Sequence, residues 1–178
     1  MIIHSHKEIQ ILRQTIALNA SKTFLEIKNL LSDLDPISFF ARLKFEKIGA
    51  DPITGTAMNT IEQINQMFSA LVVLEATDRL LYDYPDKVFD VQLGVTSGFD
   101  IESTDGSIAA ECFAVTTSAS NNKLVKDSKR LMDNCSAAYR YVFFYANDDC
   151  QEKLEKIYSR FPQITYVRIE GFETNAPL

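Results

Sequence analysis

Residues 98–115 read Gly-Phe-Asp-Ile-Glu-Ser-Thr-Asp-Gly-Ser-Ile-Ala-Ala-Glu-Cys-Phe-Ala-Val, and the expected architecture follows from this stretch. Two apolar-rich runs flank the dipeptide Asp105-Gly106, which is typical of tight turns between antiparallel strands. The first run covers residues 98–103 and the second covers residues 107–117. We therefore expect a β-hairpin here.

The turn also predicts the register of this hairpin. If Thr104 pairs with Ser107, Asp100 lies directly opposite Glu111, and the same register follows from a two-residue turn or a four-residue loop. Opposed residues of an antiparallel pair hold their Cβ atoms roughly 4.5–5.5 Å apart on one face. A three-residue loop with a bulge would shift the register by one residue and separate the two acids.

Two carboxylates at that distance repel each other unless a proton or a cation lies between them. A hard divalent ion such as Mg²⁺, held by one or two carboxylates, water and substrate phosphate, would relieve the repulsion. Two alternatives need no ion: both acids could face solvent, or one could pair with a Lys or Arg from elsewhere. The spacing predicts a site but leaves these alternatives open.

Working outward, the chain divides into a helical part, residues 1–84, and an α/β core, residues 85–178, within a single domain. In the core we expect strands at residues 88–95, 139–145 and 164–169, and helices at 120–134 and 148–161. Periodicity in the first part predicts helices up to residue 33, from 35 to 47 with Asp35-Pro36 opening the helix, and from 56 to 81. This order predicts a mixed β-sheet flanked by helices, an α/β (α+β) fold with parallel strand-helix-strand units.

The hairpin, with the helix and strand that follow, resembles the core of the PD-(D/E)xK nuclease (restriction-endonuclease-like) superfamily. In that pattern one strand ends in Asp and the next, apolar strand carries (D/E)-x-K. The similarity covers roughly residues 88–169. It implies a metal-dependent nuclease that hydrolyses phosphodiester bonds, with Asp100 and Glu111 holding Mg²⁺ or Mn²⁺. It further implies a nucleic-acid partner, DNA favoured over RNA, and fits restriction or defence roles.

The resemblance fails at one position, because Phe113 stands where the family has its lysine. A phenyl ring cannot orient water or stabilise phosphate charge, so an active site would need a cation from elsewhere. The following helix offers Lys123 and Lys126, with Arg130, on a face distinct from its apolar stripe, and superfamily variants with a helix lysine are known. The sequence does not choose between the two lysines, and both could simply be solvated.

A further acid, Glu75, lies seven residues after Phe68 on the apolar stripe of the helix at 56–81. In some nucleases of the superfamily that this chain resembles, a preceding helix supplies a supporting ligand. The resemblance therefore makes Glu75 a candidate third metal ligand. The alternative is an acid at the edge of the stripe that pairs with Arg79, four residues later.

The composition bounds the remaining possibilities. A net charge of −6 argues against a broad basic surface that would hold nucleic acid, but not against a local basic strip. The three cysteines show no metal-ligand spacing and favour free thiols in a reducing compartment. We see no signal-peptide pattern and no apolar run near the roughly 20 residues of a membrane span. We therefore expect a cytoplasmic protein with no membrane partner.

A second function remains open, in a different class. The nuclease fold could serve as a catalytically inactive binding or dimerisation module, with Phe113 marking the loss of catalysis. The apolar helix at residues 61–74 could then supply a homodimer interface, and could do so in an active enzyme as well. Metal binding separates the two readings, since an active site should bind Mn²⁺ and raise the melting temperature.

Overall fold

The computed structural model describes residues 1–31, 34–94, 98–117, 122–147 and 151–170. Eight strands and five helices are formed within these residues. In chain order they are β1 (Ile2–Ile3), α1 (His6–Leu30), α2 (Pro36–Phe45), β2 (Gly49–Ala50), β3 (Ala57–Met58), α3 (Thr60–Asp83), β4 (Phe89–Val91), β5 (Ile101–Ser103), β6 (Ile108–Val115), α4 (Lys123–Asn134), β7 (Tyr139–Ala146), α5 (Gln151–Arg160) and β8 (Ile164–Arg168).

The predicted mixed sheet is confirmed. Six strands form it in the order β1-β4-β5-β6-β7-β8, while β2 and β3 form a separate two-stranded ribbon. The pairs from β1 to β6 are antiparallel, and the β6-β7 and β7-β8 pairs are parallel. The parallel pairs are those joined through α4 and α5, as expected for strand-helix-strand units.

The predicted hairpin register is also confirmed. Ile101 pairs with Ala110 and Glu102 with Ala109, joined by a loop of four residues, 104–107. The amide of Gly106 donates to the Ser103 carbonyl at 2.8 Å, and the glycine takes a φ of 71°, which favours glycine because it has no Cβ. One residue beyond Ile101, this register sets Asp100 opposite Glu111.

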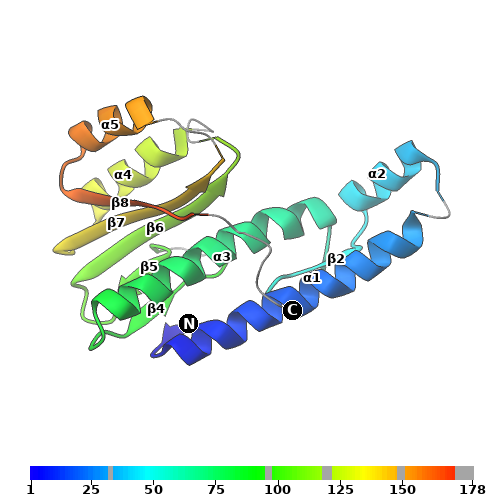
Figure 1. Ribbon diagram of the computed structural model, residues 1–178, viewed down its shortest axis with the longest axis horizontal. Helices are drawn as coiled ribbons and strands as arrows, with labels where there is room; N and C mark the ends of the chain where they lie inside the picture. The colour runs from blue at the N-terminus through cyan, green and yellow to red at the C-terminus, as the bar shows by residue number, and fades with distance from the viewer. Residues whose placement is uncertain (32–33, 95–97, 118–121, 148–150, 171–178) are drawn as a thin grey trace.

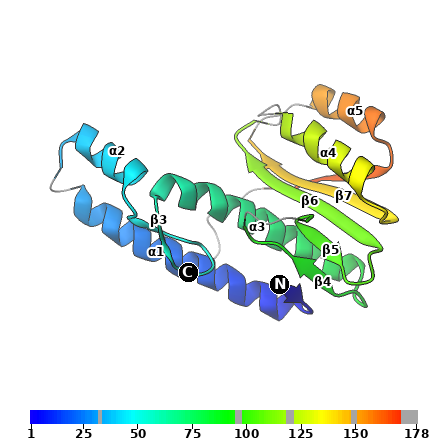
Figure 2. The ribbon, with the colours of Figure 1, turned by 180° about the vertical axis from the view of Figure 1, so that it is seen from behind.

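Helices cover the sheet on both faces, as Figures 1 and 2 show: α3 lies on one face, backed by α1, while α4 and α5 lie on the other. Side chains of β6 alternate between these layers. Ile108, Ala110 and Cys112 belong to the core beneath α3, whereas Ala109 and Phe113 pack with the residues of α4 and α5. By the same alternation Glu111 faces the α4 side.

The C-terminal half of α1 and the whole of α2, residues 18–31 and 34–45, extend beyond the sheet (Figure 1) and are called the helical arm. Asp35 caps α2 as predicted, its carboxylate accepting from the amides of Ile37 and Ser38. Yet α2 buries none of its residues. The arm therefore gains little from the main core.

One strand lies outside the predicted elements, and two local expectations need correction. The additional strand is β1, which pairs with β4, and the Met1 ammonium donates to the Val91 carbonyl at 2.7 Å. The loop expected near residue 50 contains the strands of the small ribbon. Helix α3 starts at Thr60 rather than residue 56, because Asn59 caps it by accepting from the Glu62 amide.

Cys112 and Cys135 are free thiols, as expected, and Cys150 lies outside the described residues. Val95 and Ser120, at the expected ends of a strand and a helix, also lie outside them. Within the part of the chain that is described, none of the helices combines the length and apolar character of a membrane span.

Candidate functional site

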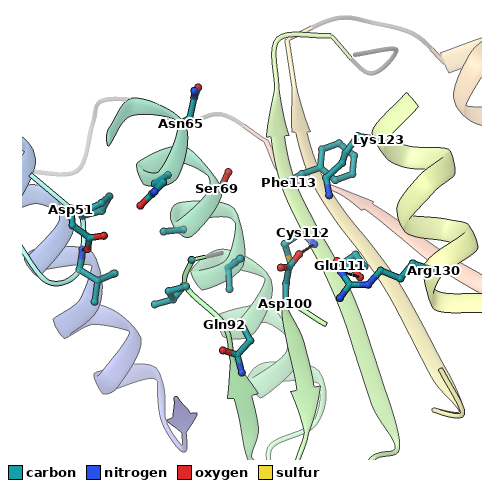
Figure 3. A pocket seen from close by; sticks show the side chains of 17 residues that line it. Asp51, Asn65, Ser69, Gln92, Asp100, Glu111, Cys112, Phe113, Lys123 and Arg130 are labelled. Atoms are coloured by element: carbon teal, nitrogen blue, oxygen red, sulfur yellow. Dashed lines mark hydrogen bonds and ion pairs between the residues drawn. The ribbon is translucent and has the colours of Figure 1, made fainter. Parts of the chain in front are cut away.

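A cavity of about 280 Å³ opens beside the part of β6 that extends beyond its hairpin partner β5. Strand β5 begins at Ile101, whereas β6 runs on to Val115, so the last part of β6 has no antiparallel neighbour in β5. The cavity occupies this space between α3 and α4, with the end of β4 below it. Figure 3 shows that Asp100, Glu111, Lys123 and Arg130 gather on its α4 side.

Asp100 and Glu111 meet at this cavity as the register predicted. The Cys112 amide donates to Asp100 Oδ2 at 2.6 Å, which fixes the carboxylate at the end of β5. The neighbouring carboxyl group of Glu111 also lines the cavity, and its side chain is only 1% exposed. Burial, followed by the charges of Asp100 and Asp127, raises the pKa of Glu111 to about 8.

Arg130 provides the positive charge closest to Glu111. Its guanidinium Nη1 lies 2.8 Å from Glu111 Oε1, and its Nη2 donates to the Gly98 carbonyl. The guanidinium carbon also lies 5.2 Å from the centroid of the Phe99 ring. The contact with Glu111 is an ion pair without hydrogen-bond alignment, because Oε1 has no hydrogen-bond partner among the described residues. Glu111 Oε1 is therefore buried and paired in charge with Arg130, but it makes no aligned hydrogen bond with the described residues.

Asp127 is a third acid of the site, which the sequence analysis did not single out. Its side chain is 5% exposed, and the Lys123 ammonium lies 2.9 Å from Oδ1. The other oxygen, Oδ2, is buried and has no hydrogen-bond partner within the described chain. Burial raises the pKa of Asp127, while Lys123 opposes this shift. The ion pair with Asp127 holds the Lys123 side chain against α4.

Phe113 is part of the core, and the cation that the strand lacks comes from α4. The Phe113 ring stacks on Phe144 with centroids 5.8 Å apart. Above it, the Lys123 ammonium lies 5.9 Å from the ring centroid, as Figure 3 shows. Lys126 is exposed and does not line the cavity. Of the two candidate lysines, Lys123 is therefore the one that lines the cavity.

Glu75 does not join the cluster. Its carboxylate lies 2.5 Å from a guanidinium nitrogen of Arg13, which also lies 3.6 Å from Asp78. Glu75 is exposed between α1 and α3 and is not among the cavity-lining residues. Its partner is Arg13 of another helix rather than the expected Arg79. We therefore remove Glu75 from the candidate ligand set.

One signal in the sequence could have found the missed acid, Asp127. Lys123, Asp127 and Arg130 are spaced i, i+4 and i+7, which puts two cations and an acid on one helix face. The apolar stripe assigned to α4 did not include Asp127, yet it is buried beside Leu124, Ser128 and Leu131. This charged triplet lies next to the apolar stripe, and its side chains are partly or fully buried beside the cavity rather than exposed on the surface.

The site thus holds the acids Asp100, Glu111 and Asp127 with the cations Lys123 and Arg130. Among the described residues, no group of three or more His, Cys, Asp or Glu side chains is arranged to hold a metal ion. An ion here would take two protein carboxylates and complete its shell with water or substrate, which suits Mg²⁺. No protein-family model, no curated protein and no solved structure matches the chain.

Proposed function

We propose that this protein is a metal-dependent nuclease that hydrolyses phosphodiester bonds, with a variant PD-(D/E)xK site. The observation that carries the proposal is that Asp100 and Glu111, opposite each other in the hairpin register, line one cavity, with Glu111 only 1% exposed and its pKa raised to about 8 by burial and by the charge of Asp100. Strongly perturbed carboxyl groups inside a cavity are typical of functional sites.

The donor set suits a hard divalent cation. Glu111 keeps its proton more strongly than an ordinary carboxyl group, since its pKa is raised to about 8, and its Oε1 makes no hydrogen bond to the described residues. Asp100 and Glu111 would hold Mg²⁺ or Mn²⁺, which when bound lowers the pKa of a water ligand and neutralises phosphate charge. The ion would replace the proton of Glu111 and remove the repulsion between the two carboxylates.

The remaining charges have separate roles in this proposal. Lys123, fixed by Asp127 and resting over Phe113, stabilises negative charge on the phosphate, as the strand lysine would. Arg130 holds Glu111 in place and offers its guanidinium to a second phosphate oxygen. The substrate is nucleic acid, with DNA favoured over RNA, in a cytoplasmic restriction or defence role.

The proposal is tested by incubating purified protein with labelled DNA and RNA in Mg²⁺ and in Mn²⁺. Cleavage should be lost in Asp100→Asn and in Glu111→Gln. Glu102→Gln is the matched control, because Glu102 is an exposed acid on β5 and lies outside the cavity. Calorimetric titration with Mn²⁺ gives an independent readout. A protein that cleaves no substrate and binds no Mn²⁺ would refute the proposal.

The helical arm supports a second candidate, a binding or dimerisation module without catalysis. Seven of its large apolar side chains are between 57% and 82% exposed. They are Leu18, Phe24, Leu25, Leu31, Ile37, Phe40 and Phe45. Patches of this kind mark interaction sites, and a second copy of the chain is the simplest partner. Light scattering over a range of concentrations would detect such a homodimer.

A further inference from the structure

The cavity extends past the acid pair to a wall of different chemistry. Across from α4, helix α3 contributes Asn65, Gln66 and Ser69 to the lining, as Figure 3 shows for the two labelled residues Asn65 and Ser69. These positions follow the i, i+1, i+4 spacing of one helix face. The wall is polar and uncharged, whereas the α4 side carries all the cations that line the cavity.

This wall has spare capacity for hydrogen bonds. The side chains of Asn65 and Ser69 make no hydrogen bond within the described part of the chain. The side chain of Gln66 makes one, in which its Nε2 donates to Glu62 Oε1 at 3.1 Å. An amide offers two donors and an acceptor, and a hydroxyl offers one donor. Below them, the buried residues Ala70 and Val73 give an apolar surface. The combination suits a flat, polar-edged group.

The size of the cavity limits what can reach the acids. Its volume of about 280 Å³ is at the lower end of the range for small-ligand sites, roughly 300–1,000 Å³. Glu111 is 1% exposed, so a phosphate must enter the cavity to approach it. A paired nucleotide within a duplex would first have to leave its partner strand, which costs unstacking and unpairing. A nucleotide of a single strand has no such cost.

We propose that the substrate is single-stranded nucleic acid and that one unpaired nucleotide enters the cavity. The phosphate lies toward Lys123 and Arg130, and the base lies along α3, where Asn65, Gln66 and Ser69 bond to its edge. Amide side chains recognise exposed base edges in this way when the bases are unstacked. This inference rests on the proposed function and adds its substrate class.

The experiment compares one oligonucleotide sequence as a single strand, as a blunt duplex and as a duplex with a single-stranded end, all in Mn²⁺. The single strand should be cleaved at least about tenfold faster than the blunt duplex, because no base pair is opened. The mixed substrate should be cut within or next to its unpaired end. Equal rates on all three substrates would overturn the inference and leave the nuclease proposal intact.

Variants of the wall give a second, separate readout. Asn65→Leu with Ser69→Val should lower the affinity for a labelled single strand about tenfold or more, since each base stacked or bonded contributes strongly. Asn29→Leu, an exposed amide on α1, is the matched control. Binding is measured by fluorescence anisotropy in the Glu111→Gln background, where no cleavage is expected. Single-strand affinity that the wall variant leaves unchanged would overturn the inference.

The two failures remain distinguishable. If the wild-type protein binds single strands through the α3 wall but cleaves none and binds no Mn²⁺, the proposed function fails and the binding site stands. If it cleaves duplex and single strand alike and the wall variant is fully active, the substrate assignment fails and the nuclease stands.

Discussion

The sheet and the helical arm differ in opposite ways from the usual rule that charged side chains are exposed and apolar side chains are buried. The sheet and α4 bury acids, with Glu111 and Asp127 among the least exposed residues, whereas the arm exposes phenylalanines and leucines. Buried acids cost stability unless they are compensated, and exposed apolar side chains contribute little to it. Stability explains neither departure, and each fits one of the two proposals, chemistry in the cavity or association on the arm.

The difference between the two regions also concerns how each is stabilised. Around the sheet, strand pairing and two apolar layers support every element. In the arm, α2 has ten residues and none is buried, a length at which an isolated helix is marginal in water. The cavity therefore has a rigid frame, as a catalytic site requires, and the arm has surface available for a partner.

The largest expected effect tests this contrast in stability. Leu80→Ala in α3 removes a fully buried side chain and should cost about 2–5 kcal/mol. Phe40→Ala, on the arm, should change the free energy of unfolding by about 0.5 kcal/mol or less, because the ring is exposed. Urea unfolding at low protein concentration measures both. A large loss for Phe40→Ala that grows with concentration would show that the arm is covered in an oligomer.

The next effect separates the two lysines of α4. Lys123→Ala should lower the cleavage rate by about a hundredfold, the scale of losing one well-placed electrostatic stabiliser, with little change in melting temperature. Lys126→Ala, at an exposed position of the same helix, should retain full activity. Single-turnover kinetics on the same oligonucleotide would measure both. Equal losses in the two variants would contradict the assignment of Lys123.

A smaller effect follows from the raised pKa of Glu111. Between its ordinary pKa of 4.5 and about 8, the unfolded chain loses this proton and the folded protein keeps it. Glu111 therefore makes the metal-free protein less stable as pH rises, up to about pH 8. Glu111→Gln should raise stability by about 1 kcal/mol at pH 8.5, and by less at pH 5. Thermal unfolding in EDTA would measure the gain, and a pH-independent difference would contradict this account.

The smallest effect concerns Glu75, the acid that we removed from the candidate ligand set. Glu75→Gln breaks the contact with Arg13 between α1 and α3, and half-exposed ion pairs of this kind contribute about 0–1 kcal/mol. Cleavage rate and Mn²⁺ affinity should stay at the wild-type values, since Glu75 lies outside the cavity. Loss of Mn²⁺ affinity in this variant would return Glu75 to the ligand set.

Much of the architecture could be read from local sequence, because it depends on neighbouring residues. The Asp105-Gly106 turn and the alternation around it predicted the register that places Asp100 opposite Glu111. The Asp35-Pro36 pair predicted the start of α2 in the same way. Turns, caps and short-period patterns are local interactions, so the amino-acid sequence specifies them directly.

Contacts between distant segments could not be read in this way. Arg13 contacts Glu75, which lies 62 positions later in the sequence. Strand β1 pairs with β4 although it has only two residues, too few to show a periodic pattern of apolar side chains. The rotation of α4 about its axis determined which lysine faces the acids, and it buried Asp127 as well. Packing of the apolar stripe against β6 and β7 sets that rotation, so the geometry of the candidate site depends on tertiary contacts that no local pattern records.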